Sequence, residues 1–421
     1  MPKLNVKRTI LTGLAFLSIS AFWQVYDSII PLILKEDFAI GDTIAGGVMA
    51  LDNVLALFLL PLFGTLSDKT HTRLGRRMPF IVCGTALAVV CMIQLPLAAN
   101  ARNLVWFMCA LGLTLLSMGL YRSPAVALMP DLTPKPVRSK GNAVINLMGS
   151  VGGIASLALI ALLVPKTENP SYLPLFAAVA CIMAAAVTVL ALTIRENRMR
   201  VPDEPREEHK DSPARGLTRP EKRSLVLILS SVFFWFMGYN AVTTAFSKYA
   251  RFYWNLTGGA FSYTLIVAQA AAICAYLPVA ALSGKIGRRK TILCGVALLA
   301  AVFGSAALFK TFNAGMFALF ALAGIAWAAI NVNSYPMVVE LARGADVGRY
   351  TGFYYTFSMA AQILTPILSG ALLENVGYVT LFPYGALCVA VSFVTMLFVR
   401  HGDAKAEKPA SRLEAFANPD D

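Results

Sequence analysis

Three charged side chains lie inside long apolar stretches of the chain: Asp27, Asp52 and Arg122. An ionised side chain at the centre of a bilayer costs about 2.5–3.5 kcal/mol on insertion scales, so such residues usually face a cavity or a partner. They also tend to mark ion or proton pathways. We therefore take these three residues as candidates for proton coupling. The alternatives are inert acids solvated near the lipid headgroups, and a snorkelling or structural arginine.

The composition indicates which kind of protein surrounds these charges. Apolar residues make up 57% of the 421 positions and charged residues 14%, where about 25% charged is usual for soluble domains. A soluble globule of this size cannot bury that much apolar surface. The chain is therefore an integral membrane protein, which excludes most soluble enzymes and cytosolic binding modules.

The lengths of the apolar stretches predict helices. A bilayer-crossing helix needs about 20 mostly apolar residues, whereas the strands of a barrel would alternate over about ten. The chain thus predicts an all-α integral membrane fold with twelve transmembrane helices. The expected spans are 10–34, 44–66, 80–99, 103–128, 142–164, 173–194, 224–249, 260–282, 291–309, 314–338, 351–373 and 378–399.

The basic residues predict the orientation. With the N-terminus in the cytoplasm, 29 of the 36 lysines and arginines fall on the cytoplasmic side, as the positive-inside rule requires. The others are Lys35, Arg102, Arg122, Lys166, Lys248, Arg251 and Lys310. We therefore expect a multi-pass protein of the cell inner (plasma) membrane with both termini cytoplasmic. The net charge of +13 then reflects topology, and no nucleic-acid partner is expected.

The chain also repeats itself. Gly75-Arg76-Arg77 recurs 212 positions later as Gly287-Arg288-Arg289. Six spans precede and six follow the polar segment between the copies, so the repeats are parallel, an arrangement found among secondary transporters. The predicted parts are an N-terminal half (1–194), a cytoplasmic linker (195–223), a C-terminal half (224–400) and a disordered cytoplasmic tail (401–421).

The loop between the second and third spans carries a recognisable motif. It reads Gly64-Thr-Leu-Ser-Asp68-Lys69, then Arg73-Leu-Gly75-Arg76-Arg77, and it resembles the signature loop of the major facilitator superfamily. The resemblance implies a cytoplasmic gate in which an acid pairs with arginines. The second copy has Gly284 in place of the acid, so we expect a weaker or absent second latch. The candidate gate residues are Gly64, Asp68, Arg73, Gly75, Arg76, Arg77, Asp131, Arg138, Arg288 and Arg289.

The same region is similar to a narrower group. The five-residue insertion after Lys69, the run Gly-Arg-Arg-x-Pro-Phe-Ile, and the stretch from Ser123 through Asp131 to Arg138-x-x-Gly-Asn resemble sucrose–proton symporters of the glycoside–pentoside–hexuronide:cation symporter group. Sodium-coupled, melibiose-type relatives carry paired aspartates before a Pro-x-x-Gly on the second span. Here Leu60 precedes that proline and the acid is Asp52, which favours protons over sodium.

The resemblance gives the charged residues possible roles. Asp27 and Asp52 fall in the outer half of the membrane and Arg122 in the inner half, which argues against a permanent contact between Asp27 and Arg122. We expect one acid to be the proton site and the other to accept sugar hydroxyls. Sugars bind to aromatic faces and amide or hydroxyl edges, and about half of such polar residues would instead hold helices together. The substrate-binding candidates are Trp23, Tyr26, Asn53, Asn146, Tyr239, Asn240, Thr243, Gln269, Asn331, Asn333, Tyr354 and Gln362.

The leading hypothesis is proton-coupled symport of a disaccharide or glycoside by alternating access in a monomer. The expected partners are the sugar, protons and membrane lipid, with no cofactor and no metal. The alternatives are a facilitator that exports drugs or small metabolites, and a non-transporting receptor or scaffold. An enzyme is not expected, because the chain shows no nucleophile–base spacing and its three histidines lie in the cytoplasmic segments.

Overall fold

The computed structural model describes residues 4–134, 137–167, 169–199, 201, 217–341 and 347–402. Most of the predicted linker (202–216) and the predicted tail from residue 403 onward lie outside the described residues.

Within the described ranges the chain is helical, and twelve of its helices are long and apolar enough to cross a membrane. The predicted all-α, twelve-span fold is confirmed. The elements are α1 (Val6–Glu36), α2 (Asp42–Lys69), α3 (Met78–Asn100), α4 (Leu104–Leu132), α5 (Arg138–Leu163), α6 (Leu173–Thr193), α7 (Glu196–Met199), α8 (Arg219–Phe252), α9 (Ser262–Ile286), α10 (Arg288–Ala306), α11 (Gly315–Leu341), α12 (Val347–Asn375), η3 (Tyr378–Thr380) and α13 (Leu381–Leu397).

Local sequence sets where several helices begin. The side chains of Asn5 and Asn103 each accept a hydrogen bond from the N–H three residues further on. Thr218 and Glu221 form a reciprocal capping box at the start of α8. Such caps satisfy N–H groups that have no partner inside the helix, so these three helices start where the polar connections end.

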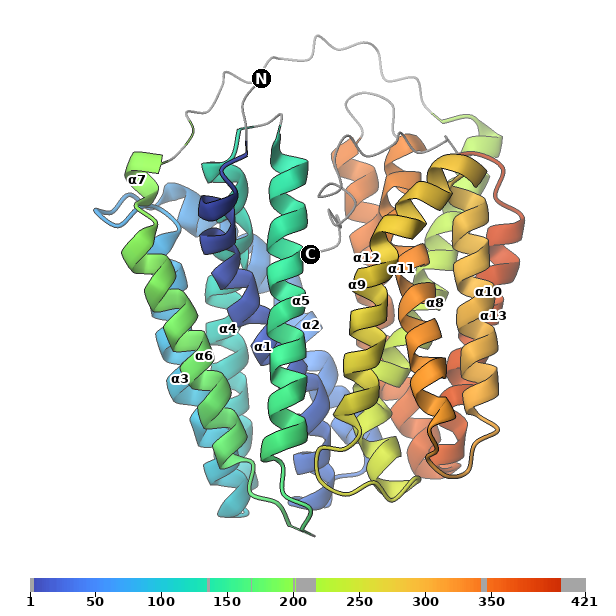
Figure 1. Cartoon of the computed structure of the whole chain (residues 1–421), viewed down its shortest axis with the longest axis horizontal. Helices are drawn as coiled ribbons and strands as arrows, with labels where there is room; N and C mark the ends of the chain where they lie inside the picture. Colours follow the sequence, from blue (N-terminus) through green and yellow to red (C-terminus); the bar gives the residue numbers. More distant parts are fainter. Residues whose placement is uncertain are drawn as a thin grey trace.

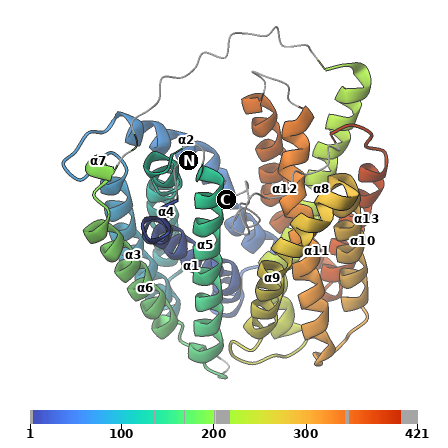
Figure 2. The same ribbon diagram turned by 45° about the horizontal axis from the view of Figure 1, so that its top comes forward.

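The helices form two groups that lie side by side (Figure 1). Helices α1–α6 make up one group, coloured blue to green, and α8–α13 the other, coloured yellow-green to red. We call the end with the loop before α3 and the starts of α1 and α8 the basic end, and the other the closed end. The basic end is the one predicted to be cytoplasmic. In both views the two groups stand further apart at the basic end (Figures 1 and 2).

Backbone contacts join the groups toward the closed end, where α2 packs on α12 and α5 on α9. Gly46 of α2 lies against the carbonyl of Pro366, and Gly370 of α12 lies against the carbonyl of Asp42. A Cβ at either glycine would overlap those carbonyls. Glycine is therefore required for this close approach of the two halves.

Candidate functional site

Partly exposed side chains on α1 mark a polar surface in the middle of the protein. They recur every three or four residues, at Leu11, Leu14, Leu17, Ser20, Trp23, Gln24 and Asp27, whereas every residue from Ser28 to Leu34 is buried. Because α1 is packed by helices of both halves, and because the deeper members of this stripe are polar, we infer that the stripe faces a cavity. Asp27 stands where the accessible stripe ends.

The corresponding helix of the other half, α8, shows the same pattern of burial. On α8, partly exposed side chains continue to Tyr239, Asn240, Thr243 and Thr244, and the six residues from Ala245 to Ala250 are all buried. The cavity between α1 and α8 is thus reached from the basic end and stops short of the closed end.

The three predicted charges gather around this cavity. Asp27 and Asp52 lie close enough for their charges to interact, and so do Asp52 and Arg122. The Arg122 guanidinium is 5.7 Å from the ring centroid of Trp23, a cation–π distance. Asp52 accepts a hydrogen bond of 2.8 Å from the Asn53 amide. Asp27 and Arg122 form no ion pair with each other within the part of the chain described here.

An aromatic pair faces the acids from the other half. Tyr239 of α8 and Trp327 of α11 stack with ring centroids 3.6 Å apart and planes 5° apart, and both are half-buried. Tyr239 lies within the electrostatic reach of Asp27. Sequence reasoning missed Trp327, because an aromatic residue in an apolar span carries no distinctive signal.

The remaining substrate candidates divide into two sets. Five of these candidates have a buried polar atom with no hydrogen-bond partner among the described residues: Trp23 Nε1, Asn240 Nδ2, Gln269 Oε1, Asn331 Oδ1 and Asn333 Oδ1. They come from α1, α8, α9 and α11, so both halves supply them.

The other candidates, and the amide nitrogen of Asn333, make local contacts. The Thr243 hydroxyl and the amides of Asn333 and Gln362 donate to backbone carbonyls three or four residues earlier in their own helices, those of Asn240, Ala329 and Ser358. The hydroxyls of Tyr354 and Ser334 bond each other, and the Tyr26 hydroxyl lies near the carbonyls of Val48 and Met49. Asn146 is buried in α5.

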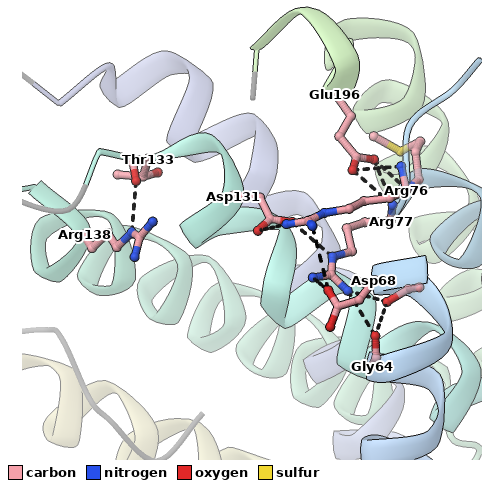
Figure 3. Close-up of polar contacts among 10 residues, drawn as sticks. Gly64, Asp68, Arg76, Arg77, Asp131, Thr133, Arg138 and Glu196 are labelled. Atoms are coloured by element: carbon pink, nitrogen blue, oxygen red, sulfur yellow. Dashed lines mark hydrogen bonds and ion pairs between the residues drawn. The ribbon is translucent and has the colours of Figure 1, made fainter. Parts of the chain in front are cut away.

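A cluster of ion pairs occupies the basic end of the N-terminal half (Figure 3). Arg76 donates two hydrogen bonds to Asp131, of 2.6 and 3.1 Å, and Arg77 donates one of 3.0 Å to the same carboxylate. Arg77 also pairs with Asp68 and with the Ser67 hydroxyl. Arg77 also donates to the carbonyl of Gly64 on α2, at 3.3 Å. The cluster joins α2, the loop, α3 and α4 of one half.

Glu196 completes this cluster and was not a sequence candidate. Its buried carboxylate accepts backbone N–H bonds from Arg76, Arg77 and Met78, of 2.9 to 3.1 Å, which is the pattern of an anion at a helix N-terminus. The carboxylate lies against Gly75, whose φ of +122° is one that only glycine adopts readily. Glu196 stands in the polar segment after α6, where an acid is ordinary.

Other gate candidates lie apart from the cluster. Arg73 is exposed, and Arg138 bonds the carbonyl of Thr133, away from the arginine pair (Figure 3). In the second copy Gly284 supplies no carboxylate, but Arg288 forms an ion pair with Glu340 of α11. Arg289 donates to the carbonyl of Leu397 at 2.6 Å.

Comparison with known proteins assigns the family. The family model for the Major Facilitator Superfamily matches residues 12–277 and 228–419. The chain belongs to the major facilitator superfamily. It is therefore a multi-pass membrane transporter, and its family implies a small-molecule substrate.

Two curated relatives of this transporter match it in part. One is the isoprimeverose transporter of Lactiplantibacillus pentosus, 24% identical over 275 residues that cover 62% of this chain and 56% of that protein. Another is the putative tartrate transporter of Agrobacterium vitis, 29% identical over 210 residues that cover 47% of this chain and 46% of that one. The matched part of the chain spans about half the length of these relatives.

Solved structures share the fold of this transporter. The xylose transporter XylE from E. coli in an inward open conformation has a TM-score of 0.67 at 14% identity and covers 98% of each chain. An auto inhibited POT family peptide transporter has a TM-score of 0.71 at 13% identity, covering 97% of this chain and 99% of that one. At such identities the likeness concerns the fold alone.

A second charged cluster in this transporter lies at the closed end and crosses between the halves. Asp42 of α2 is buried and accepts from Lys248 of α8 at 2.7 Å, from Lys35 at 3.1 Å and from the Tyr378 hydroxyl at 3.2 Å. Beside it, Arg251 of α8 bonds Glu36 at 2.7 Å. The sequence indicated only that these cations lie on the side with few basic residues.

The connection between α1 and α2 carries an acid with a perturbed pKa. Burial, and next the neighbouring charge of Glu36, raise the pKa of Asp37 from its ordinary value of 3.8 to about 6, while Arg102 opposes the shift. Tyr172 also bonds Glu36, at 3.1 Å. Burial and then the Glu36 charge raise the pKa of Tyr172 well above its usual value.

Proposed function

We propose that this transporter carries a sugar together with protons by alternating access, as a monomer of the plasma membrane with both termini in the cytoplasm. The observation that carries the proposal is the position of Asp27. This residue is a half-buried acid at the deep end of the accessible stripe, and it has no ion-pair partner in the described ranges. A carboxylate placed in this way can take up and release a proton as the cavity changes sides.

The contrast with Asp52 supports different roles for the two acids. Asp52 accepts a hydrogen bond from the Asn53 amide and lies within the electrostatic reach of Arg122, so it is already placed as a hydrogen-bond acceptor. Among the described residues, no side chain donates a hydrogen bond to Asp27. We therefore propose Asp27 as the proton site and Asp52 as an acceptor for substrate hydroxyls.

A sugar fits the other half of the cavity. Flat faces of aromatic side chains and a few convergent polar groups are what sugar sites offer. Here the Tyr239–Trp327 pair and the partnerless polar atoms of Asn240, Gln269 and Asn331 supply both. The isoprimeverose transporter among the relatives points to the same substrate class. An exporter of amphipathic drugs would need a more apolar lining.

A dicarboxylate is the second candidate. One relative is a putative tartrate transporter, and Arg122 is half-buried beside the cavity without a salt bridge in the described part of the chain. Arginine binds carboxylates with two parallel hydrogen bonds. If the substrate is an acid of this kind, Arg122 is its anchor.

The test is uptake into proteoliposomes of isoprimeverose, sucrose and tartrate under an inward proton gradient, a sodium gradient, or neither. One proton moving down 100 mV supplies about 2.3 kcal/mol, enough for about 50-fold accumulation. We expect proton-driven accumulation of a sugar. We also expect Asp27→Asn to abolish accumulation while retaining counterflow, because binding survives when coupling is lost.

Asp37→Asn is the matched control, since it removes an acid outside the cavity and should leave coupling intact. An Asp27→Asn protein that still concentrates its substrate would refute the assignment of the proton site. Accumulation of tartrate alone would replace the sugar with a dicarboxylate.

A further inference from the structure

Several bonds cross between the halves at the closed end, including Arg251–Glu36 and Tyr378–Asp42. Two others involve Lys248 and Glu374. The first is the pair between Lys248 of α8 and Asp42 of α2, both almost fully buried. The second joins the carboxylate of Glu374, in the last turn of α12, to the backbone N–H of Thr43 at 2.8 Å. The N-cap of α2 is Gly41, which has no side chain to offer. A carboxylate from the other half therefore caps this helix.

Both bonds must break when the halves separate at this end during alternating access. A buried charge left without a partner is strongly unfavourable. Asp42 avoids that state because Lys35, in its own half, already bonds it at 3.1 Å.

A second carboxylate, that of Glu374, belongs to the same half as Lys248 and acts on its charge. Lys248 also lines a small cavity together with Ser369, Gly370 and Leu373, which form the turn of α12 that leads to Glu374. The lysine side chain is a flexible stem with a point charge, so it can follow this turn toward the carboxylate.

We propose that the closed end works by exchange of ion-pair partners. When the halves separate there, the ion pair between Lys248 and Asp42 breaks and Lys248 pairs with Glu374 instead. Asp42 keeps its ion pair with Lys35. Asp42 and Lys248 each keep a partner of opposite charge in both states, so this end can open without leaving either buried charge unpaired. The mechanism does not depend on which molecule is transported.

The exchange predicts opposite effects for the two crossing residues. Lys248→Gln removes a bond of the closed state and should shift the protein toward the open one. Glu374→Gln keeps an amide oxygen that still accepts from Thr43, but it removes the partner of Lys248 in the open state. It should therefore hold this end closed. If both residues only hold the two halves together, both substitutions would shift the closed end toward its open state.

The measurement is hydrogen–deuterium exchange of the full chain in nanodiscs, followed in peptides that cover 38–50 and 245–260. Amide exchange reports the population of open states even when they are rare. Relative to wild type, we expect faster exchange in Lys248→Gln and slower exchange in Glu374→Gln. Each change should be about fivefold or more, the low end of usual two-state coupling effects.

Lys310→Gln is the control, because it removes an exposed lysine from a connection of the C-terminal half and should leave exchange unchanged. Should Lys248→Gln fail to fold, Asp42→Asn replaces it and should also speed exchange. Faster or unchanged exchange in Glu374→Gln would overturn the proposal.

Discussion

The two charged clusters use similar chemistry for different purposes. At the basic end, Asp131 accepts from two arginines that belong to its own half. At the closed end, Asp42 accepts from Lys35 of its own half and from Lys248 of the other. An interaction inside one half survives when the halves move as units, whereas an interaction between halves changes with the conformation.

The basic end uses arginines and the closed-end pair with Asp42 uses lysines, which suits the difference between fixed and changing contacts. Arginine has a planar fork that binds a carboxylate in fixed geometry, and lysine has a rotatable point charge. The rigid pairing therefore fixes the shape of the loop before α3, and the mobile pairing suits a contact that must break and re-form. The first cluster should affect mainly stability, and the second mainly the choice of conformation.

The largest expected loss of stability follows Arg77→Gln. Arg77 is buried and contacts Asp131, Asp68 and Ser67. Breaking a buried pair costs 3–5 kcal/mol in typical cases, and we expect about 3 kcal/mol because Asp131 keeps Arg76. The check is thermal unfolding in detergent.

Arg73→Gln is the control for this change, since Arg73 is exposed in the same loop and should alter stability by about 0.5 kcal/mol or less. If Arg77→Gln speeds exchange at the closed end without lowering the melting temperature, the contrast between the clusters fails.

A smaller loss should follow Glu196→Gln. The amide can still accept one of the N–H groups at the start of α3, but the charge that favours this helix end is gone. We expect about 1–2 kcal/mol, the range for charge-assisted capping. Thermal unfolding measures it, with Asn197→Ala as the comparison, because that exposed neighbour donates to loop carbonyls and to no other described group. A loss no greater than that of Asn197→Ala would mean that the cap is dispensable.

The fold was predictable from sequence because it depends on properties that each segment has by itself. A stretch of about 20 apolar residues has to cross the membrane as a helix, whatever its neighbours are. The same holds for Asp27 and Asp52, since an acid in such a stretch is costly on its own. In the structure both side chains are half-buried, and their charges lie close enough to interact.

The closed-end cluster was not predictable in this way. Asp42 and Lys248 stand 206 positions apart at helix ends, where charged residues are common, so neither carries a signal alone. Their importance arises from pairing across the halves, and pairing is a property of the packed structure. Trp327 was missed for the same reason, since only its stacking on Tyr239 distinguishes it from other aromatic residues in the spans.

The smallest expected effect concerns pH at the closed end. Because the pKa of Asp37 is raised to about 6 in the folded protein, the folded state binds its proton more tightly than the unfolded state does. The stability that Asp37 contributes is therefore present below about pH 4 and is lost as the pH rises through about 6.

We expect the melting temperature to fall between pH 5 and pH 7, and Asp37→Asn to reduce that fall. Asp37 is only half-buried, so the difference should be about 1 kcal/mol or less after solvent screening. The site is surrounded by Glu36, Arg102, Tyr172 and Arg251, which remain in both proteins, so the difference between the two pH profiles isolates Asp37.

Identical profiles would mean that Asp37 titrates normally. A larger effect than that of Glu196→Gln would mean that the closed end, and not the basic end, dominates the stability of the fold.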